Sequence, residues 1–228
     1  MGSPLTTKPY RALVGSLIYA TVTRPDIAVV VSKLSRYLEK PQEAHWKAGI
    51  RVLRFLLTTK ERSLILAPNK SEKQLATLSD STWNSNPDNC RSRTGFAILF
   101  YGCLIVWKTK LQPHTTLSST EAEYVALNAA TKEAIWVMRL LNEMGMQIKI
   151  PTPVFADNQS TIALAKHNMA KPRTKHILLR YHWIREQIKN GTFVLHYIPS
   201  NENLADLFTK VLGQKQQAKL LANLQSNL

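Results

Sequence analysis

The scarce acidic residues of this basic chain are the ones whose types and spacing could support chemistry. Only five aspartates occur among 228 residues. Two of them, Asp80 and Asp157, follow apolar runs typical of strands, and Asp206 lies early in an expected terminal helix. A glutamate from the stretch SSTEAEYVAL (118–127) could join them. Four carboxylates from four separate elements would suit Mg²⁺, which prefers oxygen ligands, and two such ions ~3.5–4 Å apart support phosphodiester cleavage.

Such a cluster would be costly without a cation, because two like charges ~4 Å apart repel by roughly 1–4 kcal/mol at effective dielectrics between water and a protein surface. Each acid also has a simpler structural interpretation. Asp157 could cap the following helix, Asp206 could be a first-turn acid favoured by the helix dipole, and Asp80 could end a strand in a turn. Glu123 could form a capping box with Thr120. Spacing alone leaves both interpretations open.

Composition indicates the kind of partner. The chain has 30 Lys and Arg against 15 Asp and Glu, a net charge of +15, which favours a polyanion such as nucleic acid. The two cysteines, Cys90 and Cys103, stand in no metal-ligand or redox spacing, so a reducing intracellular compartment is expected. No apolar run reaches the ~18 residues of a membrane span, and the start lacks the apolar region of a secretory signal. We therefore expect neither a membrane partner nor secretion.

The elements that must position these acids follow from periodicity. Residues 9–60 carry apolar residues at helical spacing, interrupted at Thr23-Arg24-Pro25-Asp26, and predict a small helical unit. RSLILAP and QLATLSDSTW then alternate like strands, and TGFAILFYGCLIVWKTKL reads as a hairpin turning at Tyr101-Gly102. A long amphipathic helix (118–145) precedes a short buried strand, TPVFADNQ, two helices, a last strand, TFVLHYIPS, and a terminal helix starting within NLADLFTKVL.

This order, β-β-β-α-β-α-α-β-α, predicts a mixed sheet with helices packed on it. Sites in sheets with helical crossovers gather at the carboxyl ends of strands, where Asp157 is expected.

Four motifs carry a family resemblance. SSTEAEYVAL, DNQSTIALA, RTKHILLRYHWIRE and YIPSNENLADLFTK, in this order, closely resemble the ribonuclease H domain of copia-type retrotransposon Pol polyproteins. The upstream stretch from PYRALVG to EAHW resembles the segment that joins reverse transcriptase to that domain, so the likeness covers about residues 9–212. It implies an α/β fold: a ribonuclease H-like mixed five-stranded sheet flanked by helices and preceded by a small helical unit. The domains expected are 1–62 (connection segment), 63–213 (ribonuclease H-like domain) and 214–228 (C-terminal helical tail).

The resemblance also implies an activity, namely hydrolysis of the RNA strand of RNA–DNA hybrids by four acids and two Mg²⁺ ions, for which Mn²⁺ can substitute. Matched by motif, the catalytic and metal-binding residues are Asp80, Glu123, Asp157 and Asp206. Residues two apart on a helix differ by ~200° in direction. If Glu123 faces the metals, Glu121 faces elsewhere, which favours Ser118 and Glu121 for the helix cap.

The implied partners are an RNA–DNA hybrid and the rest of a Pol polyprotein, including reverse transcriptase and integrase. The implied location is a cytoplasmic virus-like particle or the nucleus. Basic side chains can pair with phosphates without reading sequence, and Asn158, Gln159 and Ser160 could contact the ribose. The residues expected to bind nucleic acid are Asn158, Gln159, Ser160, Lys171, Arg173, Lys175, His176 and Arg180.

Some residues depart from the family pattern. The first-strand motif, Asp80 to Ser85, lacks the second acid and the glycine that the family usually has, and no histidine lies in the stretch 198–202. The Y-x-D-D motif of reverse transcriptases is absent, so the chain is expected to be a piece of a polyprotein or a truncated relic. The alternative function is therefore an inactive nucleic-acid-binding relic or domesticated fragment.

Overall fold

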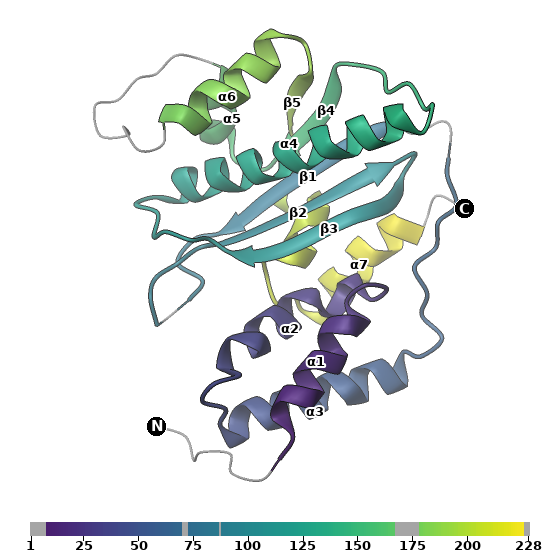
Figure 1. The fold of residues 1–228 in the computed structure, drawn as a ribbon, viewed down its shortest axis with the longest axis vertical. Coiled ribbons are helices and arrows are strands. Elements are labelled where there is room, and N and C mark those ends of the chain that lie inside the picture. The colour runs from purple at the N-terminus through teal and green to yellow at the C-terminus, as the bar shows by residue number, and fades with distance from the viewer. Residues whose placement is uncertain (1–7, 70–72, 87, 167–177, 226–228) are drawn as a thin grey trace. The chain divides into compact units, whose positions relative to one another are not determined.

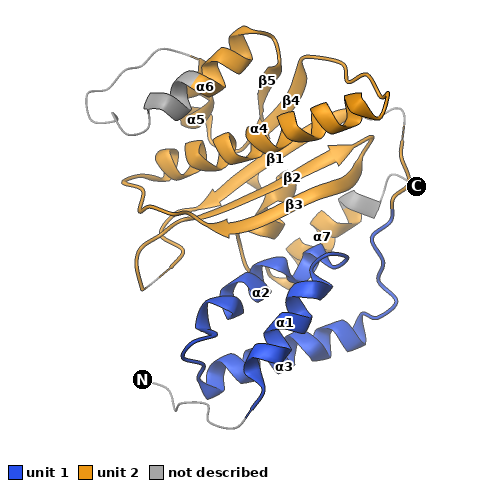
Figure 2. Cartoon of the chain, in the orientation of Figure 1, with its two compact units in different colours: residues 1–65 blue, residues 66–228 orange. Residues whose placement is uncertain are grey.

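The structure is a computed structural model that describes residues 8–69, 73–86, 88–166 and 178–225 (Figure 1). The chain divides into two compact units, residues 1–65 and 66–228 (Figure 2). Both cysteines are free thiols, Cys90 exposed and Cys103 buried. No helix within the described ranges is both long and apolar enough to cross a membrane.

The first unit is helical, as the periodicity predicted. Its helices are α1 (Tyr10–Ala20), α2 (Ala28–Leu34) and α3 (Glu43–Thr58), with 3-10 turns η1 (Pro25–Ile27) and η2 (Ser35–Tyr37). The three helices pack around a small core that includes Leu13, Leu17, Val31 and Val52. The predicted break holds a buried ion pair, since Arg24 Nη2 lies 2.7 Å from Asp26 Oδ2. This pair fixes the entry into α2.

The second unit is built on a mixed five-stranded sheet, which confirms the predicted architecture. The strands are β1 (Leu75–Thr82), β2 (Arg93–Phe100), β3 (Cys103–Leu111), β4 (Thr152–Ala156) and β5 (Phe193–Tyr197). Their order is β3-β2-β1-β4-β5. β1 pairs antiparallel with β2, and β2 antiparallel with β3, whereas β1, β4 and β5 run parallel. Helices precede the sheet and flank it (Figure 1).

The predicted hairpin is present, but one predicted strand is not. Tyr101 and Gly102 join β2 to β3 with φ of 47° and 81°, the left-handed pair typical of a two-residue turn. RSLILAP (62–68) was expected to be a strand, and this is wrong, since these residues form neither helix nor strand. The sheet already ends in β3 on one side and β5 on the other. The segment's end is instead held by Asn69, whose backbone N–H donates to the carbonyl of Tyr101 at 2.9 Å.

Two layers cover the sheet. The helices are α4 (Ser119–Glu143), α5 (Gln159–Lys166), α6 (Leu178–Lys189) and α7 (Gln214–Gln225), with 3-10 turns η4 (Ser200–Glu202) and η5 (Leu204–Phe208). α4 and η5 both contact β1 and β2. Phe96 joins the core that α4 completes, whereas a side chain at Gly95 would meet η5. Because consecutive strand residues face opposite sides, α4 and η5 cover opposite faces.

The C-terminal prediction was wrong in detail. NLADLFTKVL does not begin an α-helix; it forms the short 3-10 turn η5, and α7 starts only at Gln214. Asn203 caps the start of this turn, because its side-chain Oδ1 accepts the backbone N–H of Ala205 at 3.1 Å. The turn is therefore fixed by its own cap, and the chain is redirected before α7.

Candidate active site

Asp80 lies within β1, in the interior of the sheet. β1 is paired on both sides, with Asp80 opposite Gly95 of β2, and the Asp80 side chain is only 1% exposed. Its carboxylate accepts a hydrogen bond from the Thr209 hydroxyl. Asp80 therefore does not end a strand in a turn, and a buried carboxylate in a strand needs a specific partner.

Asp157 follows β4 directly and lies beside Asp80. Ser79 of β1 is in register with Ala156 of β4, so the next residue of each strand is an aspartate. The Ser200 hydroxyl donates to Asp157 Oδ2 at 2.6 Å. The helix-cap interpretation of Asp157 is wrong, because the neighbouring side chain caps α5 instead. Asn158 Oδ1 accepts the backbone N–H of Thr161 at 2.9 Å.

Asp206 reaches the same place from the opposite layer, on η5. Asn203 fastens this turn to the sheet, since its Nδ2 donates to the Ser79 carbonyl at 3.0 Å. Gly95 leaves the necessary space, because a Cβ there would lie 2.8 Å from the backbone carbonyl carbon of Phe208. Sequence analysis did not identify either Asn203 or Gly95 as important for the site. A glycine inside a strand was an available signal, since it often marks close approach of another backbone.

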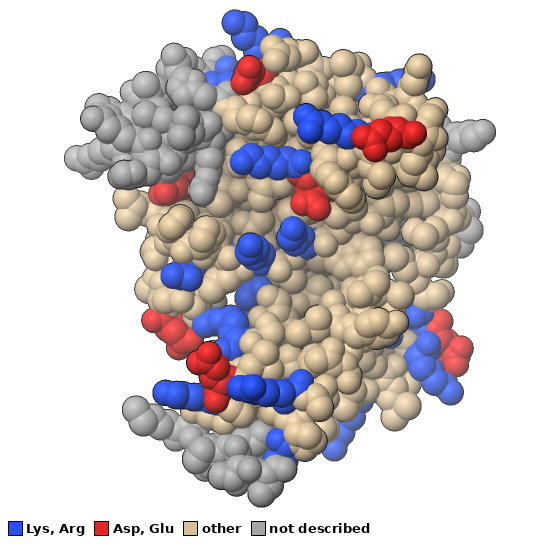
Figure 3. Space-filling model, in the orientation of Figure 1, with Lys and Arg blue, Asp and Glu red and all other residues tan. Residues whose placement is uncertain are grey.

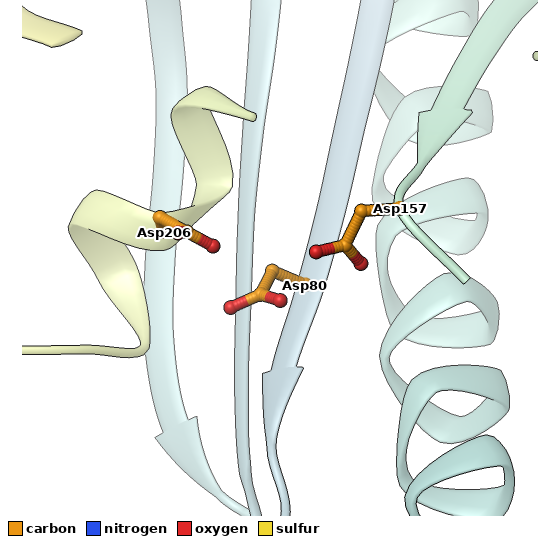
Figure 4. Close-up of side chains that lie close together, drawn as sticks. All are labelled: Asp80, Asp157 and Asp206. Atoms are coloured by element: carbon orange, nitrogen blue, oxygen red, sulfur yellow. The ribbon is translucent and has the colours of Figure 1, made fainter. Parts of the chain in front are cut away.

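The three aspartates converge. Each offers one carboxylate oxygen, and these oxygens all lie within 4.8 Å of one another. Figure 4 shows Asp80 between Asp206 and Asp157. Lys210, which the sequence did not single out, joins the cluster: its Nζ lies 2.7 Å from Asp206 Oδ1 and 3.4 Å from Asp80 Oδ1. In the described part of the chain, no other cationic side chain forms an ion pair with these aspartates.

Glu123 lies at the edge of this cluster rather than within its three-oxygen centre. Its Oε1 accepts the backbone N–H of Ser81 at 3.1 Å. Its Oε2 is buried and has no hydrogen-bond partner. An unpaired buried carboxylate oxygen is costly, and this oxygen remains available as a ligand atom.

The two glutamates of SSTEAEYVAL therefore divide as predicted. The Ser118 hydroxyl accepts the backbone N–H of Glu121 at 3.1 Å and caps α4. The Glu121 carboxylate accepts the backbone N–H of Leu117 at 2.8 Å, where a negative charge also suits the helix dipole. A capping box between Thr120 and Glu123 is thus excluded by the contacts that Ser118 and Glu121 make.

Burial and mutual repulsion control protonation at the site. Burial, and next the charges of Asp80 and Asp157, raise the pKa of Glu123 to about 9. Burial raises the pKa of Asp80 to about 7, although the Lys210 ammonium opposes the shift. Burial also raises the pKa of Asp206. Burial alone would lower the pKa of Lys210, but the carboxylates of Asp80 and Asp206 raise it above its ordinary value. The site thus holds more negative charge than one lysine neutralises.

The donor set fits a divalent cation. Three carboxylate oxygens share one centre. Glu123, whose charge interacts with those of Asp80 and Asp157, has an Oε2 without a hydrogen-bond partner. These are the hard oxygen ligands that Mg²⁺ prefers. Asp80, Asp157 and Asp206, with Glu123 next to them, are the residues that would hold such ions.

Comparison with known proteins places the chain in a family. No protein-family model matches it. It is 42% identical over 222 residues to the retrovirus-related Pol polyprotein from transposon TNT 1-94 of Nicotiana tabacum, covering 96% of this chain and 16% of that protein. The chain is homologous to a part of the Pol polyproteins of copia-type transposons. The corresponding polyprotein from transposon RE2 of Arabidopsis thaliana is 35% identical over 205 residues, 90% of this chain and 14% of the polyprotein.

The chain spans about a sixth of the length of these two relatives. Among solved structures, it resembles LC11-RNase H1 isolated from compost, with a TM-score of 0.47 and 18% sequence identity. That match covers 66% of this chain and 99% of the solved chain.

The expected nucleic-acid-binding residues of the chain are only partly described. The Oδ1 of Asn158 already accepts the hydrogen bond that caps α5. Gln159 and Ser160 are exposed in the first turn of that helix. Arg180 belongs to α6, and its side chain lies outside the described part of the structure. The remaining predicted residues, which also lie outside the described ranges, are Lys171, Arg173, Lys175 and His176.

Proposed function

We propose that this chain is a ribonuclease H that hydrolyses the RNA strand of RNA–DNA hybrids with two divalent metal ions. The observation that carries the proposal is the convergence of Asp80, Asp157 and Asp206 on one centre, from two adjacent strands and a 3-10 turn. The homology to retrotransposon Pol polyproteins supports a nucleic-acid substrate. We further propose that the chain works as part of a longer Pol polyprotein together with reverse transcriptase and integrase. Its proposed location is inside the cell, in a virus-like particle or the nucleus.

The chemistry proposed is hydrolysis at phosphorus. Divalent ions held by Asp80, Asp157, Asp206 and Glu123 would supply an activated water and stabilise charge on the leaving 3′-oxygen. The protein's own residues fix the ligands in place. The hydroxyls of Thr209 and Ser200 and the backbone N–H of Ser81 each hold one carboxylate through a hydrogen bond. Carboxylates held before the substrate arrives need no reorganisation during the reaction.

The proposed substrate is gripped by charge and shape. Lys and Arg side chains are spread over the face shown in Figure 3, in keeping with the net charge of +15. Such charges bind phosphates without reading sequence. An RNA-containing duplex offers 2′-hydroxyls in a wide minor groove, for which we propose the exposed polar residues Gln159 and Ser160 next to Asp157. These two residues would then distinguish ribose from deoxyribose next to the carboxylates.

The test is a cleavage assay on the purified chain with a hybrid labelled on either strand. In Mg²⁺ the RNA strand should be cut, and duplex DNA should remain intact. Asp157→Asn keeps the acceptor for Ser200 but removes a charge, so it should abolish cleavage and leave hybrid binding unchanged. Glu121→Gln, which removes a charge from the same unit without touching the cluster, is the matched control and should cut normally.

One observation favours the alternative of a relic that binds nucleic acid without cutting it: Lys210 already neutralises part of the carboxylate cluster. If the wild-type chain binds the hybrid but releases no product across a range of Mg²⁺ and Mn²⁺ concentrations, the relic function replaces the nuclease.

A further inference from the structure

Lys210 is held at the carboxylate cluster by the backbone that precedes it. Its backbone N–H donates to the Asp206 carbonyl at 3.0 Å, and the side chain returns to Asp206 Oδ1 at 2.7 Å. The residues before it are anchored, since Phe208 and Thr209 are at most 1% exposed. The position of the ammonium therefore follows from the same turn that delivers Asp206.

The ammonium contacts carboxylates that would hold a divalent cation. It lies within ion-pair distance of both Asp80 and Asp206, two of the three carboxylates that share the common centre. Two cations cannot occupy the same oxygens, because like charges at such short range repel strongly.

Lys210 is also able to leave. Its side chain is 34% exposed, whereas those of Asp80 and Asp206 are 1% and 7% exposed. A lysine side chain is a flexible four-carbon stem carrying a strongly hydrated charge. The ammonium can therefore swing outward while Thr209 and the backbone stay in place, and the carboxylates themselves cannot move away.

We propose that Lys210 is the resident counter-charge of the carboxylate site: a divalent cation must displace its ammonium, and a phosphate of the bound strand then receives it. This inference rests on the proposed metal-dependent function. Lys210 thereby acts as a positioning residue that keeps Asp80 and Asp206 together until the metal arrives. Since displacement is easier when a phosphate is present to pair with the ammonium, metal and nucleic acid each promote binding of the other, as linkage requires.

The experiment measures Mn²⁺ binding to the whole chain from the spectroscopic signal of free Mn²⁺, without nucleic acid. Lys210→Met keeps an unbranched side chain one atom shorter and removes its charge, so Mn²⁺ should bind about tenfold more tightly or better than to wild type. The matched control is Lys215→Met, which removes an equal charge from an exposed position on α7 and should leave the affinity unchanged.

A second titration tests the coupling. The probe is an uncleavable hybrid with a 2′-O-methylated RNA strand, whose 2′-oxygens still accept hydrogen bonds and whose binding to each protein is first confirmed without metal. It should tighten Mn²⁺ binding to wild type severalfold and to Lys210→Met much less. If the hybrid tightens Mn²⁺ binding equally in both proteins, the proposal that the Lys210 ammonium moves to a phosphate is refuted. Neither readout depends on cleavage.

The remaining outcomes are also decisive. Lys210→Gln, which keeps a hydrogen-bond donor without the charge, should behave like Lys210→Met and serves if the latter misfolds. Mn²⁺ affinity equal to or weaker than that of wild type in folded uncharged variants overturns the role of Lys210 and leaves the metal site standing. Absence of Mn²⁺ binding in every variant overturns this inference together with the proposed nuclease.

Discussion

Replacing Glu123 by glutamine should make the chain more stable at neutral and alkaline pH while removing its proposed activity. Glu123 is 7% exposed and its Oε2 has no hydrogen-bond partner. Glutamine resembles the protonated acid in shape, can still accept the backbone N–H of Ser81, and never ionises. The substitution therefore measures how much ionisation of the buried Glu123 carboxyl lowers the free energy of unfolding.

The magnitude follows from the pKa of about 9, compared with an ordinary value of 4.5. The raised pKa means that the folded chain keeps a proton that the unfolded chain has lost. The contribution to stability is therefore greatest at low pH and falls as pH rises from about 4.5 to about 9. Each pH unit in this window costs about 1.4 kcal/mol, which sets an upper limit of about 4 kcal/mol between about pH 5 and pH 8.

Urea unfolding in the presence of EDTA at these two pH values measures the effect. The wild-type chain should lose stability on going from pH 5 to pH 8, and Glu123→Gln should lose distinctly less, because the slope of stability against pH reports the protons that differ between the two states. Glu121→Gln, on the same helical turn but outside the cluster, should keep the wild-type slope. If Glu123→Gln also keeps the wild-type slope, the burial argument for this carboxylate is refuted.

Three further substitutions test how the site and the units are built. Gly95→Ala should destabilise the chain by about 2 kcal/mol in thermal unfolding, because its Cβ would meet the backbone of Phe208, and it should also abolish any rise of the melting temperature with Mg²⁺. Asp26→Ala should cost about 3 kcal/mol in urea unfolding, since it removes the buried carboxylate partner of the half-buried Arg24 guanidinium. Ser118→Ala should cost about 1 kcal/mol in the same measurement through loss of the α4 cap.

Local rules drew attention to some acids of the site, and the set of four was predicted by matching the family motifs. Asp80 and Asp157 stand out because strands are depleted in aspartate and sites gather where strands end. The separation of Glu121 from Glu123 needed only the helical angle between them. The hairpin was readable because Tyr101 and Gly102 stand between two alternating runs.

The unpredicted parts depend on contacts between distant residues. The fit of Gly95 against Phe208 joins positions far apart in the sequence, and the hydrogen bond from Asn203 to the Ser79 carbonyl spans 124 residues. A local pattern cannot show either. NLADLFTKVL has helical spacing, yet it forms only the short turn η5, which packs against β2. Nothing in the sequence distinguished Lys210 from other lysines, because its ion pairs with Asp80 and Asp206 depend on the position of the turn η5.

The 3-10 turn η5 and the residues that follow bring an acid and a base to the sheet together, as Asp206 and Lys210. Neutralising both at once, in a double variant Asp206→Asn/Lys210→Met, would leave the net charge at +15. The long-range field that draws a polyanion toward the protein is set by the summed charge, so it would persist while the local centre lost its polarity. Long-range capture of the nucleic acid can thus be kept in this double variant while the local coupling through Lys210 at the carboxylates is lost.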